Sequence, residues 1–138
     1  MENTSLRNTI LLDSTPESIN IVTNYIDEIF AANPGRLSDN YGNIIIAITE
    51  AVNNAISHGN KKDPNKKVEI NFIQNKSYIH FTVEDEGNGF DYNSVPDPTA
   101  PENLEKINGR GIFLMKNLVD KLEFHKEGKK VELIFELK

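Results

Sequence analysis

The sequence contains no cysteine, so disulfide bonds and thiolate metal ligands play no part in its fold or chemistry. It also lacks any apolar run close to the roughly 20 residues that a membrane-spanning helix needs. Its first residues, Met1 to Asn8, are polar and do not form the apolar segment of a signal peptide. Together these absences predict a soluble, cytoplasmic protein that has no membrane partner.

Positive charge is also scarce, since the formal net charge is −6, with 15 Lys and Arg residues against 21 Asp and Glu residues. Because nucleic-acid binding needs a basic surface, this balance argues against direct contact with nucleic acid. The one concentration of lysines, in residues 61–67, is interrupted by Asp63 and Pro64. We interpret it as a solvated loop rather than a phosphate-binding patch.

The length of 138 residues fits a single domain, and no repeat or linker divides the chain. Alternation and helical spacing predict the order β-α-α-β-β-loop-α-β-β. The strands are expected at about residues 6–12, 67–75, 78–84, 122–126 and 130–137. This order predicts an α+β fold, a two-layer α/β sandwich. Its sheet would be mixed and mostly antiparallel, with about five strands and three helices on one face.

Local signals suggest where these elements begin and end. Residues 6–12 are expected to form an edge strand, and Ser14 or Thr15 is expected to cap the first helix. The second helix is expected to run from about Ser38 to His58, with Gly59 as its break. A long loop rich in Gly, Pro, Asn and Asp is then expected from residue 85 to residue 110, followed by the third helix.

Glu50 and Asn54 are four residues apart on the second helix, so they lie about 40° apart around its axis. They share a polar stripe that is separate from the apolar face of the helix. One interpretation is an ordinary exposed pair of polar side chains. The other is a magnesium-phosphate site, in which the carboxylate takes a proton and the amide oxygen binds the cation.

Two glycine-containing motifs can each be interpreted either as part of a ligand site or as a purely structural feature. Residues 85–89, Asp-Glu-Gly-Asn-Gly, follow a strand directly, where glycines let the backbone approach a ligand and Asp85 can accept a hydrogen bond from an exocyclic amine. The alternative is a tight polar turn. Residues 109–111, Gly-Arg-Gly, stand at the start of the third helix, where free N–H groups and Arg110 favour an anion. The alternative is a hinge with a solvent-facing arginine.

Other signatures are missing from the sequence. There is no P-loop, no H-R-D catalytic loop, and no EF-hand, because residues 85–91 lack the required ligand spacing. His58, His80 and His125 are scattered, with no metal-ligand spacing among them. We interpret His58 as a surface or packing residue at the helix end.

In order and spacing, the three motifs resemble those of the GHKL (Bergerat-fold) ATPases, the superfamily of gyrase B, MutL and the histidine-kinase catalytic domains. Residues 48–59 resemble the N box with its E-x-x-x-N core, residues 85–89 the G1 box, and residues 109–111 the G2 box. The forms T-E-A-V-N-N-A-I-x-H-G, D-E-G-x-G-F-D and G-R-G-I-F-L-M are most similar to the anti-sigma-factor serine/threonine kinases of the RsbW/SpoIIAB type. The resemblance covers nearly the whole chain.

The resemblance implies a Bergerat fold that binds ATP or ADP with Mg²⁺. Glu50 would be the catalytic base, Asn54 would coordinate Mg²⁺, and Asp85 would bind the adenine amino group. The other residues implied to contact the nucleotide are Gly87 and Gly89 beside adenine and ribose, and Gly109, Arg110 and Gly111 in the lid over the phosphates.

The resemblance also implies partners. The γ-phosphoryl group would pass to a Ser or Thr of a STAS-type anti-sigma-factor antagonist, while a sigma factor competes for the same protein. A homodimer through the first strand and first helix is a further implication. The alternative is a nucleotide-gated binding switch, or a slow ATPase, without kinase activity.

Two positions differ from the family pattern. Some members carry an arginine just before the first glycine of the G2 box, where this chain has Ile107 and Asn108. Members often bring a Gly-Thr pair to the adenine pocket on the last strand, whereas Gly128 is followed here by Lys129 and Lys130.

Overall fold

The computed structural model describes residues 6–32, 40–88 and 107–137. Its order of elements confirms the predicted one. The elements are β1 (Leu6–Asp13), α1 (Glu17–Ala32), α2 (Tyr41–Asn54), the π-helical turn η2 (Ala55–Gly59), β2 (Lys67–Gln74), β3 (Tyr78–Glu84), α3 (Ile107–Leu118), β4 (Lys121–His125), the 3-10 turn η5 (Lys126–Gly128) and β5 (Lys130–Glu136). None of the helices in these ranges has the length and apolar content needed to span a membrane.

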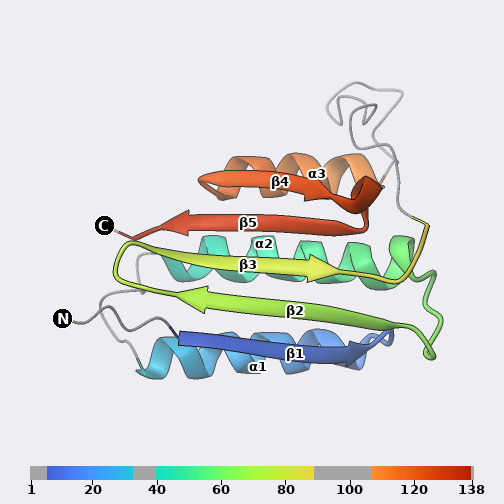
Figure 1. Ribbon diagram of the computed structural model, residues 1–138, viewed down its shortest axis with the longest axis horizontal. Helices are drawn as coiled ribbons and strands as arrows, with labels where there is room; N and C mark the ends of the chain where they lie inside the picture. Colours follow the sequence, from blue (N-terminus) through green and yellow to red (C-terminus); the bar gives the residue numbers. More distant parts are fainter. Residues whose placement is uncertain (1–5, 33–39, 89–106, 138) are drawn as a thin grey trace.

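The strands form one five-stranded sheet in the order β1-β2-β3-β5-β4 (Figure 1). All four neighbouring pairs are antiparallel, where the sequence predicted a mixed, mostly antiparallel sheet. The hairpin of β2 and β3 pairs Phe72 with Phe81, as the alternation of the two strands predicts. β1 lies at one edge of the sheet, which confirms the expectation from the sequence.

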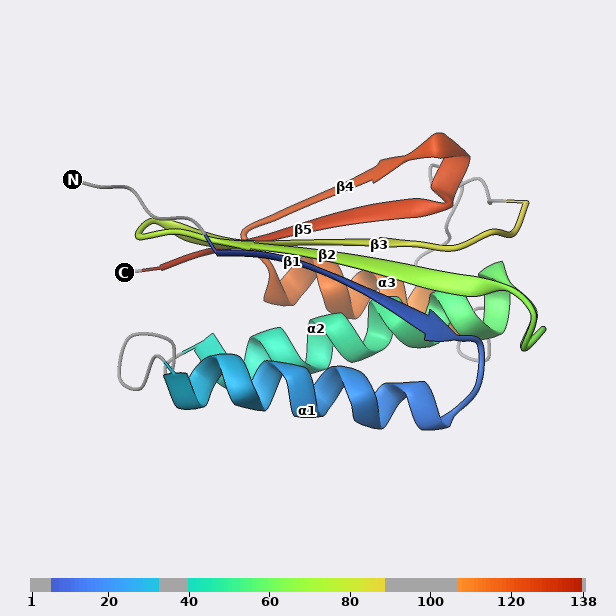
Figure 2. The same ribbon diagram turned by 60° about the horizontal axis from the view of Figure 1, so that its bottom comes forward.

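The three helices cover one face of the sheet, which gives the predicted two-layer α+β architecture (Figure 2). Alternate strand residues face this layer because successive side chains point to opposite sides of a strand. In β2 and β3, Phe72 and Phe81 are each 1% exposed, and α2 contributes Ile44 and Ile48, both fully buried. The core therefore sits between the sheet and α2.

Several local expectations are corrected by the structure. Within the described residues, neither Ser14 nor Thr15 accepts a helix N–H with its side chain: the Ser14 hydroxyl donates to the Lys66 carbonyl oxygen at 2.7 Å and accepts from Asn60 Nδ2 at 2.8 Å. The α-helical part of α2 ends at Asn54, and a π-helical turn replaces the predicted last turn. The loop expected to reach residue 110 ends earlier, because α3 begins at Ile107. The expected start of the second helix at Ser38 falls outside the described residues.

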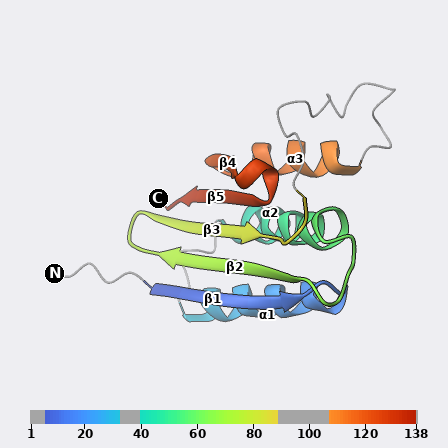
Figure 3. The same cartoon turned by 45° about the vertical axis from the view of Figure 1, so that its right-hand side comes forward.

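One end of the sandwich collects the segments that carry the sequence motifs. α2 and η2 end there, β3 ends there, and β5 and α3 begin there (Figures 1 and 3). Antiparallel pairing of β3 with β5 places Glu84 opposite Lys130, so the segments that follow β3 and precede β5 are neighbours. The topology therefore brings residues far apart in the sequence to one place.

Candidate functional site

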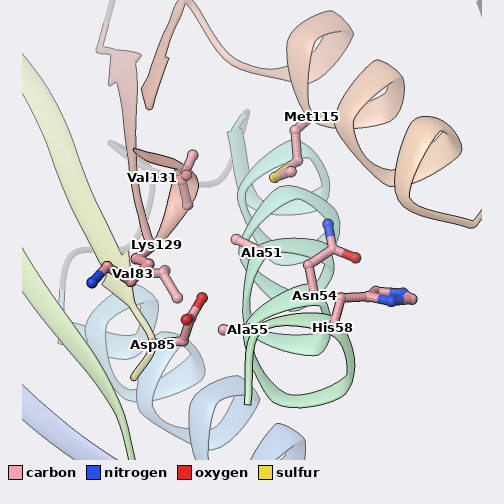
Figure 4. Close-up of a pocket in the computed structure, with 11 residues that line it drawn as sticks. Ala51, Asn54, Ala55, His58, Val83, Asp85, Met115, Lys129 and Val131 are labelled. Atoms are coloured by element: carbon pink, nitrogen blue, oxygen red, sulfur yellow. The ribbon is translucent and has the colours of Figure 1, made fainter. Parts of the chain in front are cut away.

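A pocket lies at this end, between α2 with its π-helical turn, the end of β3, the start of β5 and α3 (Figure 4). Its lining consists of Ala51, Asn54, Ala55, His58, Gly59, Val83, Asp85, Met115, Gly128, Lys129 and Val131. Met115 reaches from α3 toward Ala51, and the Asp85 carboxylate points from the end of β3 toward Ala55 (Figure 4). The pocket thus joins apolar walls to a few polar groups, as small-molecule sites do.

Asp85 is the charged group of this pocket that the sequence predicted. Its backbone N–H donates to the Lys129 carbonyl oxygen at 2.9 Å, which fixes the chain just after β3. Its Oδ1 accepts the Gly87 N–H at 2.8 Å. Burial raises the pKa of Asp85 above its usual value, and the Gly87 hydrogen bond and the Lys129 charge oppose this rise only in part. Asp85 is therefore a half-buried acceptor held in one orientation.

Two glycines allow the segments around Asp85 to approach closely. A Cβ at Gly59 would lie 2.3 Å from the Asp85 carboxylate carbon, and one at Gly87 would lie 1.8 Å from the Gly59 carbonyl oxygen. Both separations are far shorter than any contact between nonbonded atoms. The end of α2 and the loop after β3 therefore interlock only because these two positions have no side chain.

Asn60 holds the interlocked segments together and is fully buried. Its Oδ1 accepts the Glu86 N–H at 2.7 Å, and its Nδ2 donates to Ser14 Oγ at 2.8 Å and to the Lys67 carbonyl oxygen at 3.0 Å. The side chain thus joins the turn after β1, the start of β2 and the loop after β3. A buried polar network that is fully paired gives a single arrangement of its segments.

Asn60 was missed as a site residue by the sequence analysis. No local pattern in the sequence reveals it, because its partners Ser14 and Glu86 lie 46 and 26 residues away along the chain. The backbone N–H of Asn60 donates to the Ala55 carbonyl oxygen at 2.8 Å, which closes the π-helical turn. Lys61 and Lys62 follow with positive φ angles of 54° and 59°, a backbone conformation that is uncommon for residues other than glycine. Single π-helical turns are frequent at functional sites.

Asn54 lines the pocket, and its Oδ1 is buried with no hydrogen-bond partner among the described residues. An unpaired buried oxygen costs free energy, so a group that binds there would recover it. Glu50 lies one helical turn before Asn54 and is half-buried. It does not line the described pocket. The structure therefore brings Asn54 and Asp85 to one cavity and leaves Glu50 on the adjoining turn of α2.

The remaining predicted residues divide into three groups. Gly87 lies next to the pocket, in contact with Asp85. Gly109, Arg110 and Gly111 belong to the first turns of α3, at the same end of the sandwich. Gly89 falls outside the described residues.

Three residues interpreted differently from the sequence also line the pocket. His58, expected on the surface or in packing, is at its rim, where burial and then the Lys62 and Lys61 charges lower its pKa. Gly128 and Lys129, which stand where family members often have Gly-Thr, line the opposite wall. Gly128 has a φ of 92°, a conformation that glycine adopts without strain.

The chemistry of the pocket suits a flat apolar group with an exocyclic amine. Val83, Met115 and Val131 supply the apolar walls, and Asp85 supplies the acceptor. The free oxygen of Asn54 is a hard ligand of the kind that Mg²⁺ accepts together with phosphates and water. The start of α3 adds helix N–H groups at this end, which favour anions.

Comparison with known proteins agrees with this chemistry. A sequence profile described as "Histidine kinase-like ATPase domain" matches residues 12–135. The chain is 36% identical over 110 residues to the anti-sigma F factor of Geobacillus stearothermophilus, an alignment that covers 77% of this chain and 74% of that one. It is 28% identical over 113 residues to the serine-protein kinase RsbW of Bacillus subtilis (strain 168), covering 78% and 70%.

A solved structure is similar to this chain in its fold. The crystal structure of the RsbU and RsbW domains of a Mycobacterium tuberculosis protein matches with a TM-score of 0.67 and 20% identity. The match covers 96% of this chain and 32% of that one, so this chain spans about a third of that protein's length. At this identity the likeness is one of fold.

Proposed function

The chain belongs to the histidine kinase-like ATPase domain family, and we propose that it is an ATP-dependent protein serine/threonine kinase of the anti-sigma-factor type. Its relatives named anti-sigma F factor and serine-protein kinase RsbW support this proposal. In it, residues 1–138 act as a single ATP-binding domain. The observation that carries it is the buried, unpartnered Oδ1 of Asn54 in the same pocket as Asp85.

Asn54 would hold a magnesium ion, which would neutralise charge on the phosphates of ATP or ADP. The amide oxygen fits this role because Mg²⁺ keeps several waters and takes only one or two protein ligands beside the phosphates. Its lack of an internal partner fits as well, since a side chain already paired inside the protein would have to break that bond first.

Asp85 would accept a hydrogen bond from the adenine amino group. The half-buried carboxylate is held by Gly87 and aimed toward α2, so it would recognise adenine without rearrangement. Guanine presents an oxygen at the corresponding position, and a carboxylate would repel that oxygen. The site would therefore select adenine nucleotides. Gly87 and Gly89 would shape the adenine and ribose side.

Glu50 would act as the general base. In the transfer, the oxygen of a Ser or Thr hydroxyl on the target forms a bond to the γ-phosphorus, and the bond to the bridging β,γ-oxygen breaks. Glu50 would take the hydroxyl proton, which contributes on the order of 10²–10⁴-fold to the rate. Its place one turn before Asn54 would set it beside the bound phosphates. Positioning and charge neutralisation would supply the rest of the rate.

The G2-box residues would close the site. Gly109, Arg110 and Gly111 stand in the first turns of α3, where helix N–H groups point out of the helix end. They would meet the phosphates, and Arg110 would add a charged contact.

The relatives' names support a sigma factor and a phosphorylated antagonist protein as partners. The phosphoryl acceptor would be a STAS-type antagonist protein in the cytoplasm, and a sigma factor would bind in competition with it. The protein would act without contacting nucleic acid itself, and a homodimer through β1 and α1 is part of the proposal.

The experiment is a transfer assay with [γ-³²P]ATP, Mg²⁺ and a lysate of the native cell. We expect label on a second protein with the unaltered chain, and none with Glu50→Gln, which should still bind nucleotide. Glu136→Gln, which removes an exposed carboxylate at the end of β5 away from the pocket, is the matched control and should transfer normally. Asn54→Ala should weaken nucleotide binding in the presence of Mg²⁺ but much less in its absence, as measured by calorimetry.

The possible results separate the proposal from its alternatives. Release of free phosphate without protein labelling would make the chain an ATPase. Nucleotide binding with neither product would make it a nucleotide-gated switch. Normal transfer by Glu50→Gln would show that Glu50 is not the base.

A further inference from the structure

The helices lie on one side of the sheet only (Figure 2), and a second cluster of polar side chains lies on the opposite face. Strand alternation turns His80 of β3, Glu132 of β5 and the pair Glu123 and His125 of β4 to this outer face. Glu123 pairs directly with Glu132 in the β4–β5 register. The topology therefore unites two histidines for which the sequence shows no metal-ligand spacing.

The distances within this cluster are short. His125 Nε2 lies 2.9 Å from Glu132 Oε1, and His80 Nε2 lies 2.5 Å from Glu132 Oε2. Glu123 Oε1 is 3.8 Å from His125 Nε2. One ligand atom from each of Glu123, His125 and Glu132 falls within 4.8 Å of the others.

These separations are close to those around a bound zinc ion. Tetrahedral Zn²⁺ with ligands at 2.0–2.2 Å holds its donor atoms about 3.3–3.6 Å apart. The distances from His125 Nε2 to the Glu132 and Glu123 carboxylates, 2.9 Å and 3.8 Å, lie on either side of this range. Because the strands are hydrogen-bonded neighbours, their backbones would not have to move.

The charges of the cluster also favour a cation. Like charges that face each other in a strand pair are destabilising, and Glu123 faces Glu132. Lys121 Nζ lies 3.4 Å from Glu123 Oε2, while the other carboxylate oxygen, Glu123 Oε1, is the one paired with His125.

We propose that Glu123, His125 and Glu132, with His80 on the neighbouring strand, bind a divalent transition-metal ion of the zinc type. Mixed imidazole and carboxylate donors suit Zn²⁺ and its neighbours in the transition series, whereas Mg²⁺ and Ca²⁺ prefer oxygen donors alone. Glu123 and His125 are 45% and 43% exposed, so the ion would retain contact with water. The site is separate from the nucleotide pocket, which lies on the helix side of the sheet.

The test is calorimetric titration of Zn²⁺ into the full chain after treatment with a chelator, without nucleotide. We expect saturable binding of one ion per chain, and at least about tenfold weaker binding in His125→Gln and in Glu132→Gln. The matched control is His58→Gln, which removes a histidine outside the cluster and should leave the zinc affinity unchanged. Excess Mg²⁺ should not displace the zinc.

Two further measurements keep the test decisive. Circular dichroism should show that His125→Gln is folded, as its exposure predicts, so any loss of binding reflects the lost ligand. Co²⁺ should give visible absorption typical of low coordination number in the unaltered chain, with a changed spectrum in His80→Gln. Absence of saturable binding in the unaltered chain, or equal weakening by His58→Gln, would overturn the proposal.

Discussion

The two ends of helix α2 differ in how tightly they are packed. At its N-terminal end, and within the part of the chain that the structure describes, Asn40 makes no side-chain capping bond and a Cβ at Gly42 would meet no atom within 4 Å. At its C-terminal end, a π-helical turn leads into Gly59 and the fully buried Asn60, and a Cβ at Gly59 would lie 2.3 Å from Asp85. The N-terminal end therefore has space for an added side chain at Gly42, and the C-terminal end has none at Gly59.

This difference shows what the candidate site requires of the fold. At the C-terminal end, the contacts with the loop after β3 are made by glycines and polar groups, in addition to the apolar burial of Ala55 and Ile56. Tight packing fixes the direction of one carboxylate, which a ligand site needs and a structural helix end does not. The predictions below test this comparison through one shared measurement, the affinity for Mg-ATP, and are ordered from the largest expected effect to the smallest.

The largest effect on nucleotide affinity is expected from Asp85→Asn. The asparagine can still accept the Gly87 N–H, but its amide would then turn a donor toward the adenine amino group. A lost hydrogen bond to a charged group costs about 1.5–3 kcal/mol, or about 10- to 150-fold in affinity. Calorimetry with Mg-ATP measures this loss.

The stability of Asp85→Asn, in contrast to its nucleotide affinity, should stay the same or rise. Because burial raises the pKa of Asp85, the folded state holds its proton more tightly than the unfolded state. The ionised carboxylate therefore costs stability above its folded-state pKa, and this cost disappears as the pH falls through it. Asp85→Asn removes the cost, so we expect an equal or higher melting temperature at neutral pH. A clear fall in the melting temperature would contradict a purely functional role.

The next largest effect is expected from Gly87→Ala. The new methyl group would overlap the Gly59 carbonyl oxygen, so the loop after β3 must shift and carry Asp85 with it. Overpacking of this kind typically costs about 1–3 kcal/mol of unfolding free energy. We expect about a tenfold loss of nucleotide affinity together with a lower melting temperature. Unchanged affinity would mean that the interlocked glycines do not position Asp85.

A smaller loss of affinity is expected from Asn60→Ala. The Asn60 side chain is not part of the pocket lining, and its loss frees the Glu86 N–H, the Ser14 hydroxyl and the Lys67 carbonyl oxygen. Three lost hydrogen bonds at about 0.5–1.5 kcal/mol each give a fall in unfolding free energy of roughly 1.5–4.5 kcal/mol. Denaturant unfolding measures it. The transfer rate at saturating ATP should change less than the affinity for ATP, because the side chain positions the loop and does not take part in the chemistry.

The smallest effect is expected from Gly42→Ala, at the other end of the same helix. The added methyl group has free space, and alanine restricts the unfolded chain, so stability should rise by about 0.4–1 kcal/mol. Nucleotide affinity should stay the same. A loss of affinity in this variant as large as that of Gly87→Ala would show that the two ends do not differ in the way proposed.

The sequence predicts the layers of this fold well because local periodicity determines them. The alternation in β2 and β3 indicates which residues face the helices, and Phe72 and Phe81 are buried as the alternation requires. The family motifs likewise identify Asn54 and Asp85, which the structure brings to one pocket. Both kinds of signal depend on residues that are close together in the chain.

Contacts between distant segments are not visible in such patterns. Ser14 has the residue type of a helix cap, yet it bonds to Lys66, which is a neighbour only because β1 pairs with β2. His80 and His125 are far apart in the sequence, and only the β3-β5-β4 order sets both against Glu132. The π-helical turn at Ala55–Gly59 also escapes prediction, because an α-helix and a π-turn share the same apolar spacing over so few residues.

The network around Asn60 has a consequence for how the chain is made. Asn60 bonds to a side chain 46 residues earlier and to a backbone group 26 residues later, and the pocket wall formed by Gly128, Lys129 and Val131 comes later still. Contacts of such long sequence separation form late in folding. A nascent chain on the ribosome therefore has no complete pocket until Val131 has emerged, so nucleotide capture requires that the start of β5 has already been made and has paired with β3.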